Sequence, residues 1–222
     1  MGFLSLFRRA PVTHLFCGLC VAGMAWVWWI DGSSAGQVGS AGGASFLVGW
    51  RLRVGAVAAG RWGSLWAYSV VHGGLWHWLV NGVGVWVTGR TFERVWGSGA
   101  VLWCGVLGCL GGALGYLLTV WLDCRVGLLG GCVGASGVLA GLLGGLCARV
   151  AGGRLRGVVL GVPFWVRTEV LAGVVLLLIG VEAFVWPQVT AYGAHLGGFI
   201  LGGALTRWGG AADGAALPVG RD

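Results

Sequence analysis

Long apolar stretches, separated by short polar connections, dominate the hydrophobic pattern of this chain. Six of them reach the roughly 17 residues or more that a helix needs to cross a bilayer. The last apolar run, interrupted only by Glu182, is too long for one helix, and Pro187 with Gln188 favours a turn that divides it into two spans. The predicted spans are residues 10–30, 65–89, 96–122, 132–148, 168–186 and 190–207. The pattern therefore predicts an all-α polytopic membrane protein, with a single six-transmembrane-helix domain over residues 1–208 and a disordered cytoplasmic tail over residues 209–222.

A few polar side chains interrupt these spans, and polar groups inside a bilayer indicate function by default. His77 and Asn81 are four residues apart on the second predicted span, so they share one helix face. Ser136 and His195 lie near the beginnings of the fourth and sixth predicted spans. Because the second, fourth and sixth spans run in the same direction, all these residues are expected at a similar depth. We expect His72, close to the same end, to hydrate the site or hold the loop before it.

The chemistry of this set is acyl transfer. A serine hydroxyl becomes a nucleophile when a base takes its proton, and histidine is the usual base. Ser136 is the expected nucleophile and His195 its base, while His77 and Asn81 can donate N–H groups to an oxyanion. Glu182 is interpreted as an interfacial charge, which makes the predicted site a dyad. A zinc site is the chemical alternative, but no third ligand stands at a convincing spacing, so neither metal nor cofactor is expected.

Composition and charge agree with a membrane protein. The chain is 57% hydrophobic and 9% charged, whereas soluble domains carry about 25% charged residues. Its basic residues are all arginine and scattered, which argues against nucleic acid as a partner. With the N-terminus in the cytoplasm, ten arginines face inward and four outward, as the positive-inside rule favours. Both termini are then cytoplasmic, and the site opens to the outer side.

Two features near the ends of spans leave alternatives. Arg8 and Arg9 precede an apolar stretch, as in a signal peptide, but tryptophans at the outer end of that stretch favour a retained first span. Cys124 and Cys132 fall in or beside an outward-facing loop, where an oxidising exterior would permit a disulfide.

Four motifs combine these polar residues with glycine: His72-x4-His77-x3-Asn81, Gly89-x3-Glu93-x3-Gly97-Ser98, Gly134-x-Ser136-Gly137 and Ala194-His195-x2-Gly198-x3-Gly202. Together they resemble the motifs of the rhomboid family of intramembrane serine proteases. The resemblance implies a six-helix rhomboid-like bundle with Ser136 as nucleophile and His195 as base. Gly134, Gly137, Gly198 and Gly202 are then supporting residues, because small residues on facing stripes let two helices approach closely.

The resemblance also implies what the protein does. It implies an endopeptidase that cleaves single-span membrane proteins within the lipid bilayer, in a bacterial cytoplasmic (inner) membrane. The alternative is a non-catalytic protein of the same fold that binds transmembrane helices. One departure concerns the site: Ala140 stands where the family commonly has an aromatic residue stacked on the base. Another group is then needed to hold the His195 ring.

Overall fold

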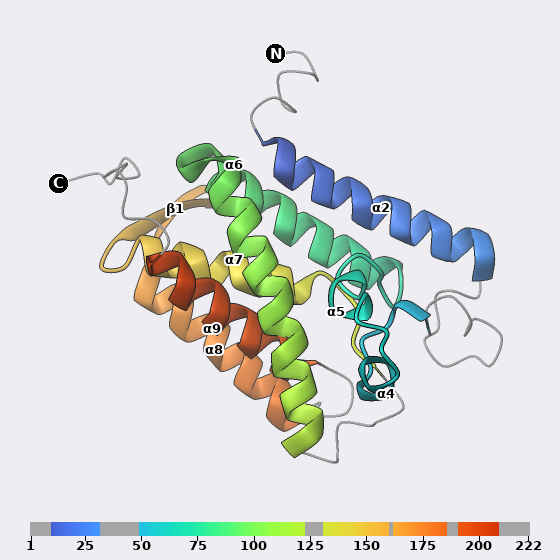
Figure 1. The fold of residues 1–222 in the computed structure, drawn as a ribbon. Coiled ribbons are helices and arrows are strands. Elements are labelled where there is room, and N and C mark those ends of the chain that lie inside the picture. The colour runs from blue at the N-terminus through green and yellow to red at the C-terminus, as the bar shows by residue number, and fades with distance from the viewer. Residues whose placement is uncertain (1–9, 32–48, 123–130, 160–161, 186–190, 209–222) are drawn as a thin grey trace.

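Helices make up most of the computed structural model, which describes residues 10–31, 49–122, 131–159, 162–185 and 191–208. The predicted tail, Cys124 and the turn at Pro187 lie outside the described residues. Figure 1 shows the arrangement of the elements. In chain order these are α2 (Pro11–Asp31), α4 (Val54–Ala58), α5 (Ser64–Ala67), α6 (Leu75–Leu122), α7 (Ser136–Arg149), β1 (Arg154–Val159), β2 (Val162–Arg167), α8 (Thr168–Val185) and α9 (Tyr192–Trp208).

Among the described residues, three helices are both long and apolar enough to cross a membrane: α2, α6 and α8. With 48 residues, α6 is about 72 Å long at 1.5 Å per residue, more than twice the hydrocarbon thickness of a bilayer. It is two arms joined at Gly97, whose φ of 82° breaks the helical geometry. In Figure 1 the first arm lies beside α2, and the second turns back toward the opposite end of the molecule.

Two parts of the chain are not continuous helix: the beginning of the predicted span at residues 65–89, and the connection between α7 and α8, which lies between predicted spans. In the stretch at residues 65–89, the long helix begins only at Leu75, after the short α5 and a non-helical segment. β1 and β2 form an antiparallel two-stranded hairpin, in which Val159 pairs with Val162. This hairpin lets a segment too short to span satisfy its backbone hydrogen bonds locally.

The centre of the bundle is a three-helix contact among α7, α9 and the second arm of α6. The helices meet through glycine, so their backbones touch directly. Gly198 and Gly202 of α9 pack on the carbonyl oxygens of Gly137 and Gly141 of α7. The small-residue stripe on α9 thus packs against Gly137 and Gly141 of α7. Close packing of this kind is the main attraction available between helices in lipid.

Glu93 links α2 to the bend in α6. Its Oε1 accepts hydrogen bonds from the Val12 N–H (2.9 Å) and from the Ser98 hydroxyl (2.7 Å). Its Oε2 accepts from the Thr13 N–H (2.9 Å) and from the Thr13 hydroxyl (2.7 Å). The carboxylate therefore caps the first turn of α2, where the helix dipole favours negative charge. This explains the Gly89-to-Ser98 motif as a structural element, far from Ser136 along the bundle.

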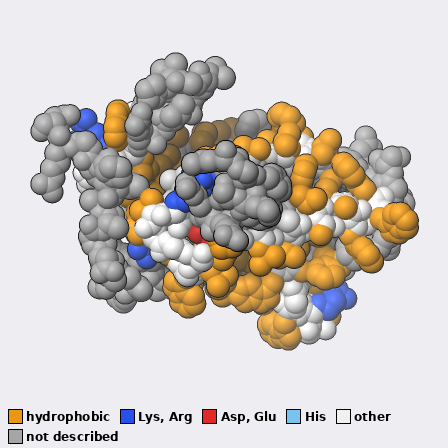
Figure 2. Space-filling model, turned by 90° about the horizontal axis from the view of Figure 1, so that it is seen from above, with side chains coloured by type: hydrophobic (Ala, Val, Ile, Leu, Met, Phe, Trp, Pro, Cys, Tyr) orange, Lys and Arg blue, Asp and Glu red, His pale blue; other side chains and the backbone are white. Residues whose placement is uncertain are grey.

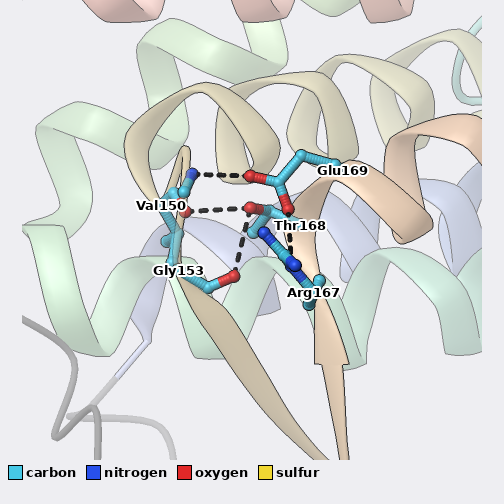
Figure 3. Close-up of polar contacts among 6 residues, drawn as sticks. Val150, Gly153, Arg167, Thr168 and Glu169 are labelled. Atoms are coloured by element: carbon cyan, nitrogen blue, oxygen red, sulfur yellow. Dashed lines mark hydrogen bonds and ion pairs between the residues drawn. The ribbon is translucent and has the colours of Figure 1, made fainter. Parts of the chain in front are cut away.

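The beginning of α8 is anchored to the end of α7 (Figure 3). The Thr168 hydroxyl lies 3.0 Å from the Val150 carbonyl oxygen and 3.3 Å from that of Gly153. Glu169 accepts a hydrogen bond from the Gly152 N–H at 2.9 Å. Further along α8 the described side chains are largely exposed, Ile179 being the buried exception. α8 is thus anchored by side-chain hydrogen bonds at its first turn, whereas most of its remaining side chains are exposed.

The described surface is rich in large apolar side chains, and Figure 2 shows hydrophobic groups spread over much of one face. Phe184, Trp29 and Trp121 are 90%, 87% and 78% exposed. A soluble protein rarely exposes apolar patches on this scale, whereas a lipid-facing surface requires them. The chain is therefore an integral membrane protein with an all-α bundle, to which the short hairpin is appended.

Candidate active site

Ser136 is the first residue of α7, and a tight turn delivers it there. Gly134 has a φ of 114°, a conformation that side chains disfavour. The Gly134 N–H donates to the Tyr68 carbonyl at 2.8 Å, and the Ala135 N–H donates to Nε2 of His72 at 3.2 Å. The approach to Ser136 is therefore held at two successive backbone amides. Because Ser136 opens the helix, its own N–H has no partner within the helix.

His195 reaches Ser136 across the α7–α9 contact. Its Nε2 lies 2.8 Å from the Ser136 hydroxyl oxygen, within the range of a short, well-formed hydrogen bond. The two residues are 59 positions apart in the chain. The glycine packing at Gly198 against Gly137 brings their helices close enough for this contact. The structure thus brings together the two residues that the sequence singled out as nucleophile and base.

Glu182 is the residue that the sequence interpretation placed incorrectly. It was expected to be an interfacial charge, with no carboxylate available to His195. Instead, its Oε2 lies 2.6 Å from Nδ1 of His195, on the opposite side of the ring from Ser136. The contact was not apparent because Glu182 is on α8, and its rotation toward α9 depends on how those two helices dock. A signal existed, since this is an acidic residue in an apolar run with no basic residue near it.

His77 and Asn81, one turn apart on the first arm of α6, both face Gly134. A Cβ built on Gly134 would lie 2.7 Å from Nε2 of His77 and 3.4 Å from Nδ2 of Asn81. The Asn81 side chain is buried, and its Nδ2 has no hydrogen-bond partner among the described residues. A buried amide donor without an acceptor is costly and is usually explained by function. Both donors thus face the turn two residues before Ser136.

The tautomer of His77 follows from its other nitrogen. The Gly73 N–H donates a long hydrogen bond, 3.4 Å, to Nδ1 of His77. Because Nδ1 accepts, a neutral His77 carries its proton on Nε2. That atom is the one directed at Gly134, so His77 presents a donor beside Asn81.

His72 and Tyr68 support this arrangement from behind. His72 is completely buried, and its ring meets that of His77 edge to face with centroids 5.3 Å apart. Tyr68, also fully buried, donates its hydroxyl to the Cys109 carbonyl at 2.8 Å. It therefore ties the Gly134 turn to the second arm of α6. Sequence reasoning missed Tyr68, because a tyrosine in an apolar segment carries no distinguishing pattern.

Other places in the described part of the chain do not share this chemistry. No group of three His, Cys, Asp or Glu side chains among the described residues is arranged to hold a metal ion. An apolar cavity of about 290 Å³ lies between α2, α6 and α7, lined by residues such as Phe16, Val85 and Leu142. Neither Ser136 nor His195 lines it. The polar cluster around Ser136 is thus the candidate site.

Comparison with known protein families identifies a rhomboid domain over residues 59–211. The chain belongs to the rhomboid family. This match covers more than half of the chain and includes each proposed site residue, from His72 to Gly202. A search of curated protein sequences found no match. The rhomboid family includes intramembrane serine proteases, which agrees with the chemistry expected of a serine beside a histidine.

Proposed function

We propose that this rhomboid protein is an intramembrane serine endopeptidase that cleaves transmembrane segments of single-span membrane proteins. The observation that carries the proposal is the 2.8 Å contact between Nε2 of His195 and the Ser136 hydroxyl. This is the geometry by which a base accepts a proton from a nucleophile.

The reaction proceeds by acyl transfer. His195 takes the hydroxyl proton as the Ser136 oxygen bonds to the carbonyl carbon of the scissile peptide. His195 then gives that proton to the departing amine as the carbon–nitrogen bond breaks, leaving an acyl ester on Ser136. A water molecule, activated by His195 in the same manner, hydrolyses the ester and restores the hydroxyl.

Charge on the tetrahedral intermediate is stabilised from the Gly134 side of the nucleophile. Asn81 Nδ2 and His77 Nε2 are the side-chain donors, and the Ser136 N–H at the start of α7 is a backbone donor. The unpaired Asn81 amide supports this role, since such a donor acquires its acceptor only when the oxyanion forms. No metal or cofactor takes part in this scheme.

The same proposal includes the location of the site. The arginine distribution favours cytoplasmic termini in a bacterial inner membrane, with Ser136 toward the outer side. Substrates are then cut near the outer ends of their transmembrane helices. The alternative is a non-catalytic rhomboid that only binds such helices. That role does not require a serine in hydrogen-bond contact with a histidine.

The deciding experiment is labelling of the purified, detergent-solubilised protein with a fluorescent fluorophosphonate. We expect one covalent adduct on Ser136, located by peptide mass spectrometry, and cleavage of a model single-span substrate in proteoliposomes. Ser136→Ala should abolish both, and His195→Ala should lower both to a small residual rate, while each variant keeps the thermal stability of the parent. Cleavage at the parent rate by Ser136→Ala would refute the proposal and favour the helix-binding alternative.

A further inference from the structure

We infer that Glu182 is the positioning residue of this site, so that Ser136, His195 and Glu182 act as a hydrogen-bonded triad. The inference deepens the proposed function and rests on it. It is motivated by the 2.6 Å contact between Oε2 of Glu182 and Nδ1 of His195, which sits opposite the contact to Ser136.

The chemistry of a carboxylate decides which tautomer His195 adopts. An ionised carboxylate can only accept hydrogen bonds, so Nδ1 of His195 must carry a proton to satisfy it. A neutral imidazole then has a bare Nε2, and that is the atom facing the Ser136 hydroxyl. Glu182 therefore selects the one neutral tautomer in which His195 can accept the serine proton.

Glu182 also fixes the ring in space. A histidine ring turns about its bonds unless both nitrogens are engaged, and here the two contacts lie on opposite sides of the ring. Ala140, one turn along α7 from Ser136, has no ring that could stack on the imidazole. The Glu182 carboxylate on α8 thus orients the His195 ring, which Ala140 on α7 cannot do.

The position of Glu182 within α8 argues against a purely structural role. It lies in the last turn of the helix, which ends at Val185. Negative charge is disfavoured there, because the helix dipole is itself negative at that end. Its side chain is only 28% exposed, and its neighbours along α8 are apolar. A partly buried carboxylate at this place is explained by a partner, and His195 is in contact with it.

During the reaction the Glu182 carboxylate stays ionised and keeps its hydrogen bond to the Nδ1 proton of His195, which holds the imidazole ring in place. When Nε2 takes the Ser136 proton, His195 becomes an imidazolium ion with both nitrogens protonated. Its positive charge then faces the negative charge of Glu182, a pairing that is stronger than the same contact with neutral imidazole. No proton passes to Glu182, and the proton on Nε2 goes on to the leaving amine.

Because the side-chain hydrogen bonds at the beginning of α8 lie in its first turn, the contact between Glu182 and His195 depends on where the other end of α8 lies. Displacement of the Glu182 end would separate the carboxylate from His195 and leave the base unoriented. The base is therefore fully positioned only while α8 is docked on α9.

The first test is the isosteric substitution Glu182→Gln, which keeps size and an accepting oxygen but removes the charge. We expect kcat for a model transmembrane substrate to fall by on the order of 10²–10⁴, the range associated with general-base catalysis, while KM stays within a few-fold. The labelling rate of Ser136 by a fluorophosphonate should fall in parallel. Glu169→Gln is the matched control, since it removes the same charge from the first turn of the same helix, and it should retain the parent kcat.

A double-substitution cycle separates positioning from structure. If Glu182 acts through the base, Glu182→Gln should add no further loss to the residual rate of His195→Ala. An equal proportional loss in both backgrounds would overturn the inference. If the parent protein labels on Ser136 but Glu182→Gln keeps the parent kcat, the inference fails while the protease proposal stands. Absence of any labelling of the parent protein refutes the protease proposal itself.

The second test needs no substitution at Glu182. Nitrogen NMR of protein labelled with ¹⁵N-histidine reports which ring nitrogen carries the proton, and the spectrum of His195→Ala assigns the signal. We expect His195 in the parent protein to be protonated on Nδ1 near neutral pH. Protonation on Nε2 alone would overturn the inference, whatever the activity of the variants.

Discussion

Gly198 of α9 lies directly against the carbonyl oxygen of Gly137, the residue that follows the proposed nucleophile on α7. A Cβ at position 198 would overlap that oxygen, which belongs to the backbone and cannot move without shifting the helix. This contact holds the helix bearing His195 against the helix bearing Ser136. The position of the base therefore depends on the absence of a side chain at 198.

Gly198→Ala should accordingly separate α7 from α9. We expect both a slower reaction of Ser136 with a fluorophosphonate and a loss of stability of about 1–3 kcal/mol, the usual result of overpacking. Labelling kinetics and thermal unfolding in detergent measure the two effects. Gly173→Ala on α8, where a Cβ would meet nothing within 4 Å, is the matched control. Equal reactivity of the two variants would show that the contact does not position the base.

His77→Ala and Asn81→Ala should each remove one donor from the proposed oxyanion site. Loss of one such donor costs on the order of 10²–10³ in rate, and it should appear in kcat because the donors act on developing charge. The measurement is steady-state cleavage of a single-span substrate in proteoliposomes. A rise in KM alone would instead assign these residues to substrate binding. His72→Ala is expected to act indirectly, by freeing the turn before Ser136, and to lower stability as well.

Glu93→Ala should destabilise the protein without altering the chemistry of Ser136. The change leaves Val12, Thr13 and Ser98 without the acceptor that now serves them. Each hydrogen bond to a charged group contributes about 1.5–3 kcal/mol, so thermal unfolding in detergent should occur at a clearly lower temperature. The folded fraction should still label at the parent rate. A parent-like unfolding temperature would contradict the role of Glu93 in joining α2 to α6.

Substrate access is predicted to involve displacement of α8. A peptide bond in a transmembrane helix is shielded and hydrogen-bonded, so a substrate must unwind locally as it comes in from the lipid. We therefore expect substrates with Gly, Pro or polar residues near the cleavage point, since these weaken a helix. A disulfide engineered between α8 and the first arm of α6, at the end where Glu182 and His77 lie, should slow cleavage of a membrane substrate.

The same cross-link should spare hydrolysis of a small water-soluble ester, and reduction should restore the slowed reaction. The ester is the control because it reaches Ser136 from water and needs no opening between helices. If the cross-linked protein cleaved the helical substrate at the parent rate, lateral access beside α8 would be excluded.

Much of the site could be predicted from local spacing. His77 and Asn81 share a face because four residues make about one turn of a helix, whatever the rest of the chain does. The similar depth expected of Ser136 and His195 follows from counting apolar residues, since the bilayer imposes a length on each span. Membrane character itself follows from composition, because only apolar surface is stable against lipid.

What tertiary structure alone decided is which helix faces touch. Glu182 and His195 are thirteen positions apart in the chain and lie on different helices, and no periodicity within α8 determines its rotation about its own axis. The rotation of α8 results from the anchoring of Thr168 at its first turn and from the docking of its other end against α9. The capping of α2 by Glu93 is likewise long-range, as is the support of the Gly134 turn by Tyr68. Each joins segments that the chain brings together only after packing, where backbone contact through glycine selects one relative placement of the helices.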